Sequence, residues 1–169
     1  MSSSETSEIE FVAAVREYCG WLEQEPYEPE SERFTALVLL SRLYATALTL
    51  PEVDPGSLPP FPNQGDAQLS ARDEQVMARL SAFPMRSYWR LDGGGEQGGE
   101  KVTDDVARDL FLTYSAVRPL LDVFDSGEER RNGAVWSWRA GFWGDWGHHS
   151  SNAIQALHKY YHEKAWADE

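Results

Sequence analysis

Apolar residues recur at helical spacing along the first half of the chain. Two stripes, at steps of three or four residues, comprise Phe11, Val15, Tyr18 and Leu22, and then Leu37, Leu40, Tyr44 and Leu48. Such spacing places the members of a stripe on one helical face, so the pattern predicts two amphipathic helices. Pro26 and Pro29 end the first segment, and Pro51 ends the second. A third, short helix is predicted after Ser70, because Ser70 and Asp73 have the spacing of a capping box.

The second half of the chain carries two longer helical stripes. Thr103 is predicted to cap a helix with Asp104 and Asp105 in its first turn, and Gly127 is predicted to end it. Its apolar face comprises Val106, Leu110, Tyr114, Val117, Leu121 and Phe124. The stripe of the last segment, 128–165, comprises Val135, Trp138, Phe142, His149, Ala153, Ala156 and Tyr160. This segment is predicted to form either one long helix or two helices that keep a common face.

No stretch shows the alternation of apolar and polar residues that is typical of strands. The sequence therefore predicts an all-α fold, a single-domain helical bundle of five or six helices that spans residues 1–169. Two long loops are expected, a Pro-rich loop over 51–69 and a Gly-rich loop over 92–101, and residues 1–7 are expected to be disordered. The Gly-rich loop is not a phosphate-binding loop, because Glu100 stands where the lysine of that motif belongs.

Charge and cysteine content restrict the partners and the compartment. The formal net charge of −13 disfavours binding to nucleic acid or to anionic membranes, which need clusters of Lys and Arg, but it is compatible with a basic protein partner. Cys19 is the single cysteine, so an intrachain disulfide is excluded, and its place on an apolar stripe predicts burial. The chain shows no secretory signal and no apolar run of membrane-spanning length, so we expect a cytoplasmic protein.

Asp145 and His149 form the candidate chemical site. A spacing of four residues brings two side chains together on a helix, and Asn152 follows on the same side. Because His149 shares the apolar stripe, we expect it to be partly buried, with Asp145 fixing its tautomer and raising its pKa. Two interpretations remain open. The pair is either a core histidine held by its carboxylate, or a functional pair that serves as a general base or as metal ligands, supported by His148 or Asn152.

A second candidate site lies a few residues earlier, where Trp136 and Trp143 flank Arg139 at helical spacing. A guanidinium stacked on indole rings gains a cation–π interaction. If this face is buried, it is a structural sandwich. If it is exposed, it is a binding surface, because Trp and Arg dominate interaction hot spots. The candidate binding residues are Trp136, Arg139, Trp143 and His148.

The C-terminal segment carries a set of motifs with a known counterpart. In order, they are Val135-Trp136-Ser137-Trp138-Arg139, Phe142, Trp146-Gly147, His149, Ala153 and Ala156-Leu157-His158. They resemble the signature of the bacterial family called domain of unknown function 5063, which has Trp-x-Trp-Arg, His-Trp-Gly-x-His and Ala-Leu-x-Ala-Leu-His. Asp145 stands at the first histidine of the second motif, so a site that needs two imidazoles does not carry over. The resemblance implies an all-helical fold and supplies no established activity.

Two classes of function are consistent with these features. The first is a noncatalytic, acidic protein-binding or regulatory module without a cofactor, of which an immunity-type inhibitor is one specific form. The alternative is a metal-dependent hydrolase in which Asp145 and His149 hold a divalent metal such as zinc. A small-molecule sensor with its ligand between helices is a third class, for which the sequence offers no specific residue. The lack of a complete catalytic motif favours the first class.

Overall fold

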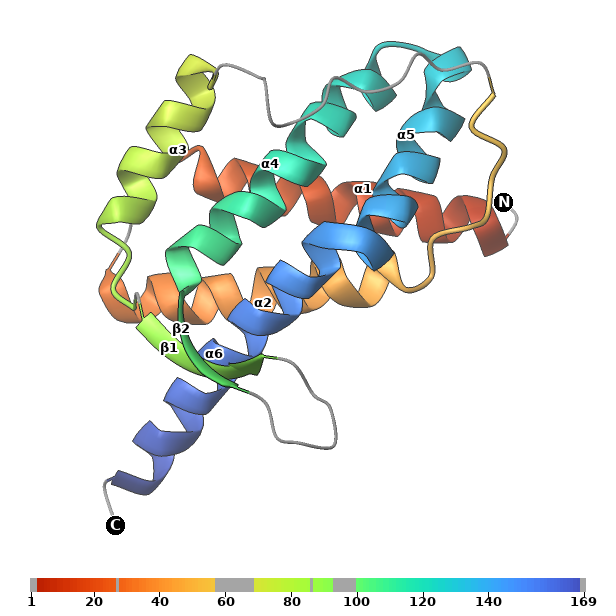
Figure 1. The fold of residues 1–169 in the computed structure, drawn as a ribbon. Coiled ribbons are helices and arrows are strands. Elements are labelled where there is room, and N and C mark those ends of the chain that lie inside the picture. The colour runs from red at the N-terminus through yellow and green to blue at the C-terminus, as the bar shows by residue number, and fades with distance from the viewer. Residues whose placement is uncertain (1–2, 27, 57–68, 86, 93–99, 168–169) are drawn as a thin grey trace.

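A computed structural model describes residues 3–26, 28–56, 69–85, 87–92 and 100–167 of the chain. In chain order, its elements are α1 (Ser3–Leu22), α2 (Pro29–Ala47), α3 (Ala71–Ser81), β1 (Ser87–Asp92), β2 (Glu100–Asp105), α4 (Val106–Asp125), α5 (Glu128–Gly141), the π-helix η2 (Phe142–Trp146) and α6 (Gly147–Ala167). Figure 1 shows α4 and α5 in front of α1 and α2, while the end of α6 projects from the body. The predicted all-α fold is confirmed.

The core lies where α4 packs against α1, α5 and α6. Trp138 of α5 is fully buried there, and its Nε1 donates to the carbonyl oxygen of Val117 on α4 at 3.0 Å. The ring of Phe11 on α1 meets the Trp138 ring edge-on, with 5.2 Å between centroids. A buried N–H without an acceptor costs about 1–3 kcal/mol, so this bond fixes how α5 packs on α4. Cys19 is buried, as predicted, and burial raises the pKa of its thiol well above the ordinary value.

The N-terminal helices begin and end close to the expected residues, with one exception. Because α1 begins at Ser3, the expectation that residues 1–7 are disordered is wrong for Ser3–Ser7, and residues 1–2 lie outside the described residues. The capping box of α3 is confirmed, since Ser70 Oγ accepts from the backbone N–H of Asp73, whose carboxylate accepts from that of Ser70. Of the Pro-rich loop, residues 51–56 and 69 have no regular structure, and 57–68 lie outside the described residues.

An antiparallel hairpin is the element that the sequence pattern missed. Strands β1 and β2 pair from Ser87 opposite Asp105 to Asp92 opposite Glu100. The ends of the expected Gly-rich loop are therefore strand residues, and 93–99 lie outside the described residues. Thr103 lies in β2 and does not cap α4. The cap is Asp105, whose Oδ1 accepts from the backbone N–H groups of the second and third residues that follow it.

The last helical segment is interrupted by a π-helical turn, η2, between α5 and α6. The turn holds Trp146 in the core, where its Nε1 donates to the carbonyl oxygen of Trp138 at 3.1 Å. At Gly147, a Cβ atom would collide with the carbonyl oxygen and the ring of Phe142. This close approach is the physical reason for glycine at that position. The predicted face is buried on both sides of the interruption, at Val135 and Trp138 before it and at Ala153 and Ala156 after it.

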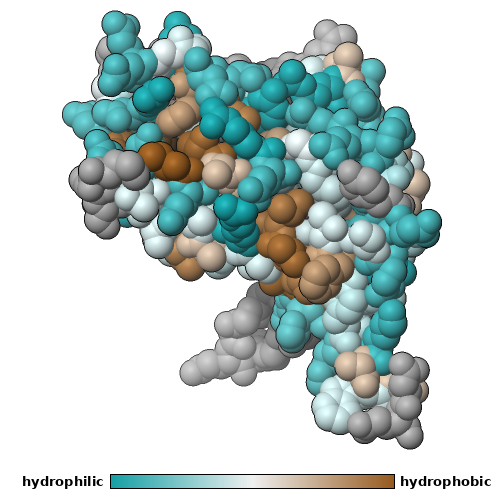
Figure 2. Space-filling model, turned by 180° about the vertical axis from the view of Figure 1, so that it is seen from behind, coloured by the Kyte–Doolittle hydropathy of each residue, from teal (hydrophilic) through white to brown (hydrophobic). Residues whose placement is uncertain are grey.

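Figure 2 shows the opposite face of the molecule, where hydrophilic surface surrounds small apolar patches. Phe34 and Val38, one turn apart on α2, are among the exposed apolar side chains of the described residues. The Phe34 ring packs edge-on against Tyr161 of α6 at 5.9 Å between centroids. None of the described helices is long and apolar enough to cross a membrane.

Candidate functional site

A buried carboxylate, Asp109 of α4, joins three elements of the fold. Its side chain is only 1% exposed. Oδ2 accepts a hydrogen bond from the hydroxyl of Tyr88 on β1, and Oδ1 lies 2.8 Å from Nδ1 of His149 on α6. One turn further along α4, the hydroxyl of Thr113 lies 3.1 Å from that of Ser150, also buried. A polar seam therefore runs between α4 and α6 inside an otherwise apolar interface.

Asp109 orients His149 and changes its titration. The hydrogen bond with Asp109 raises the pKa of His149 above its ordinary value, and burial of the ring opposes that rise. With Nδ1 held by Asp109, Nε2 faces Asp145 of η2, whose Oδ1 is 3.7 Å away. The predicted proximity of Asp145 and His149 is thus observed, but the carboxylate that fixes the ring is Asp109. An acidic residue between Val106 and Thr113 on the buried face of α4 was the signal that could have identified it.

The sequence also suggested that Asp145 and His149 hold a metal. They offer two donors, and within the described ranges no group of three or more His, Cys, Asp or Glu side chains is placed to hold a metal ion. Catalytic zinc usually has three protein ligands. The residues described therefore do not make up a complete metal site, and a metal at this pair stays a prediction.

A groove of about 690 Å³ lies between the hairpin and α6. Residues 87–89 of β1 line one side, and His148, Asn152, Gln155 and Tyr160 of α6 are among those that line the other. The amide nitrogen of Asn152 lies 3.1 Å from Nε2 of His148. His149 points from the same helix toward α4, so the groove and the buried carboxylate lie on neighbouring faces of α6 and share Tyr88.

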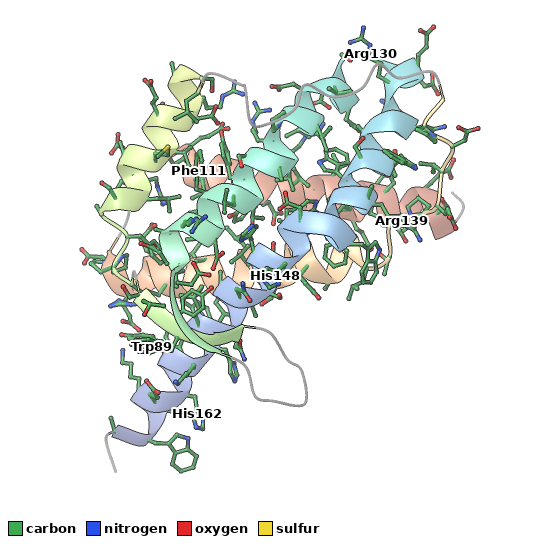
Figure 3. The ribbon with its side chains drawn as sticks, in the orientation of Figure 1. Trp89, Phe111, Arg130, Arg139, His148 and His162 are labelled. Atoms are coloured by element: carbon green, nitrogen blue, oxygen red, sulfur yellow. The ribbon has the colours of Figure 1, made fainter. Side chains whose placement is uncertain are left out.

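The four predicted binding residues fall into two groups. Trp136 is 45% and Trp143 67% exposed, so the buried sandwich is excluded and both indoles lie at the surface with Arg139 between them in sequence. The cation–π contacts among the described residues involve other arginines, so Arg139 is not stacked between the two tryptophans. His148 belongs to the groove. Figure 3 shows His148 near the hairpin that carries Trp89, and Arg139 further away on α5.

Comparisons with known proteins agree on the fold. The model of a family described as domain of unknown function (DUF5063) matches residues 3–163. The crystal structure of protein BF1032 from Bacteroides fragilis is similar, with a TM-score of 0.72, 22% sequence identity and 92% of each chain covered. At that identity the likeness concerns the fold alone. A search of curated proteins gives no match.

Proposed function

The chain belongs to the DUF5063 family, and we propose that it is a noncatalytic, acidic protein-binding module. The observation that carries the proposal is the exposure of two tryptophans on one stretch of helix, Trp136 on α5 and Trp143 on η2. Tryptophan is a highly buried residue on average, so two exposed indoles seven residues apart call for an explanation. A partner that covers them is the simplest explanation.

The local structure supports a rigid contact surface. The Trp143 ring packs edge-on against Phe142, with 4.9 Å between centroids, and Phe142 is itself buried in the core. The indole is therefore anchored on one side and exposed on the other. Rigid aromatic side chains lose little conformational entropy when they are covered, and Arg139, which lies between them in sequence, adds a donor-rich cation.

The charge of the chain indicates the kind of partner. With a net charge of −13, long-range attraction favours a basic protein and accelerates its association at low salt. The indoles would supply the apolar contact, while surrounding carboxylates such as Asp145 would meet the partner's cations. An immunity-type inhibitor, which covers the basic active site of a toxin, is the specific form that we propose to test first.

The proposal is tested by affinity capture from native lysate with the wild-type chain and with a Trp136→Ala, Trp143→Ala double variant. Trp166→Ala, which removes an equally exposed indole at the far end of α6, is the matched control. We expect a stoichiometric basic partner with the wild type and the control. Its affinity for the double variant should fall by about 30-fold or more, since a hot-spot residue contributes about 2 kcal/mol. Absence of any stoichiometric partner at low and physiological salt, or equal capture by the double variant, would contradict the proposal.

One observation favours the alternative, a metal-dependent hydrolase. The carboxylate of Asp109 pairs with Nδ1 of His149. Histidines that bind a metal through one ring nitrogen usually pair the other with a carboxylate, a backbone carbonyl or a water in the same way. The two available donors leave this alternative with less support than the binding role. Elemental analysis of the purified protein decides between them. One equivalent of zinc or another divalent metal, lost in Asp145→Ala, would favour the hydrolase, and metal far below one equivalent would remove it.

A further inference from the structure

The groove between β1 and α6 carries an inference that is independent of the surface tryptophans. Its aromatic character comes from both sides. Trp89 of β1 is 59% exposed although it lines the groove, and Tyr88 is next to it. Tyr160 lines the opposite side, and the guanidinium of Arg33 lies 4.6 Å from the centre of its ring. Exposed rings at the edge of a groove are platforms on which a planar molecule can stack.

The polar groups of the groove are arranged along one line. His148, Asn152 and Gln155 follow one another at steps of four and three residues on α6, so they share a helical face. The hydrogen bond between Asn152 and His148 fixes the side-chain amide of Asn152. The side-chain amide of Gln155 makes no hydrogen bond within the described part of the chain. A carboxamide presents a donor and an acceptor side by side. That pair complements the edge of a heterocyclic base, as amide side chains do with adenine.

The charge of the groove points to a ligand without net charge. Among the described lining residues, Lys159 and Glu163 are the permanently charged ones, and their Nζ and Oε1 atoms lie 3.7 Å apart. The described lining of the groove is therefore close to neutral, in a chain with a net charge of −13. A phosphorylated ligand would meet repulsion from the chain and a lysine already paired with a carboxylate. The same argument disfavours a nucleic acid strand.

Both sides of the groove are held in place by contacts outside it. The hydroxyl of Tyr88 donates to buried Asp109, which ties the hairpin to α4. α6 is tied to α2 in turn, since Lys164 Nζ lies 2.9 Å from Oε1 of Glu30 and the hydroxyl of Tyr161 donates to the Glu30 carbonyl oxygen at 3.1 Å. A groove whose sides are fixed before binding loses less entropy when a ligand enters.

From these features we propose that the groove binds an uncharged, planar heteroaromatic molecule of the nucleobase type. The ring stacks on Trp89, and its donor–acceptor edge meets the amides of Asn152 and Gln155. The site does not depend on the partner proposed for Trp136 and Trp143, which lie on other elements, so either proposal can fail without the other.

The test uses the full chain, with its tryptophans labelled with ¹⁵N, titrated with adenine, adenosine, AMP and benzyl alcohol. Benzyl alcohol has an aromatic ring without the donor–acceptor edge, and AMP adds a phosphate. Trp89→Ala and Gln155→Ala are the site variants, and Trp166→Ala is the matched control for loss of an exposed indole. Assignment of the Trp89 indole signal comes from its absence in the first variant.

We expect saturable binding of adenine or adenosine that shifts the Trp89 indole N–H signal. Trp89→Ala should weaken it by about five- to 150-fold, the range typical for loss of one stacked base, and Gln155→Ala should also weaken it. The Trp166→Ala control should bind as the wild type does, and AMP should bind no more tightly than adenosine. The proposal is overturned if neither base binds up to its solubility limit, if both site variants bind as the wild type does, if benzyl alcohol binds as tightly as adenine, or if AMP binds more tightly than adenosine.

Discussion

Replacement of Asp109 by alanine tests whether the buried carboxylate holds the fold together. It accepts from the hydroxyl of Tyr88 and pairs with Nδ1 of His149 at 2.8 Å, so its loss leaves two polar groups on two other elements without their acceptor. Each such group costs about 1–3 kcal/mol when it stays buried, and removal of one member of a buried pair typically costs about 3–5 kcal/mol in total. We therefore expect Asp109→Ala to lower the free energy of unfolding by about 3–5 kcal/mol. That is a large part of the roughly 5–15 kcal/mol that stabilises a typical domain.

The measurement is urea-induced unfolding followed by tryptophan fluorescence and by circular dichroism. Asp145→Ala is the matched control, because this exposed carboxylate also faces His149 but at 3.7 Å, and exposed ion pairs contribute at most about 1 kcal/mol. A double-mutant cycle with His149→Ala should show a coupling energy of about 1 kcal/mol or more for Asp109. A loss for Asp109→Ala no larger than that for Asp145→Ala, or a coupling energy near zero, would refute the assignment of Asp109 as the anchor.

Two further predictions concern the same segment of the chain. The pKa of His149 is raised above its ordinary value of 6.5, chiefly by Asp109. Protonated His149 therefore adds stability that is fully present below its pKa in the unfolded state and is lost as the pH rises through its pKa in the folded state. In urea unfolding, the deficit in the free energy of unfolding of His149→Asn relative to the wild type should shrink from about pH 5.5 to pH 8.5. A deficit that grows with pH would contradict this. At Gly147, alanine should destabilise the protein by about 1–3 kcal/mol, because its Cβ meets Phe142, whereas Gly144→Ala, with open space around its Cβ, should be neutral or stabilising by up to about 1 kcal/mol. Thermal melts of the two variants check this, and equal melting temperatures would show that the close approach is unimportant.

The helical architecture could be predicted from the sequence because its signals are local and long. The stripe from Val106 to Phe124 and the capping box at Ser70 both rest on residues a few positions apart, and both features are present in the structure. The hairpin was missed because neither of its six-residue strands alternates cleanly between apolar and polar residues. Tyr88 and Trp89 are adjacent in the first strand, and the second contains a single apolar residue, so no period of two emerges. Thr103 was assigned as the helix cap for the same reason, since nothing marked it as a strand residue.

The candidate site was predicted in part, and the missing part is non-local. The spacing of Asp145 and His149 is enough to bring them together, and the structure has them 3.7 Å apart. Asp109 lies 40 positions before His149 in the chain, and only the packing of α4 on α6 brings it to the ring. Whether Trp136 and Trp143 are exposed likewise depends on which face of α5 meets α4. The hydrogen bond from Trp138 to Val117 determines which face of α5 meets α4, and neither segment alone predicts this contact.

The π-helical turn at Phe142–Trp146 sets the direction in which α6 presents its side chains. A turn that accommodates one additional residue rotates everything after it by about 100° relative to an unbroken α-helix. Regular α-helical winding of the same residues would instead turn the imidazole of His149 away from α4, with Asn152 and Gln155 following it around the axis. The geometry of both the buried seam and the groove therefore depends on how one short segment winds, and a change from π-helical to α-helical winding between Trp138 and His149 would alter both at once.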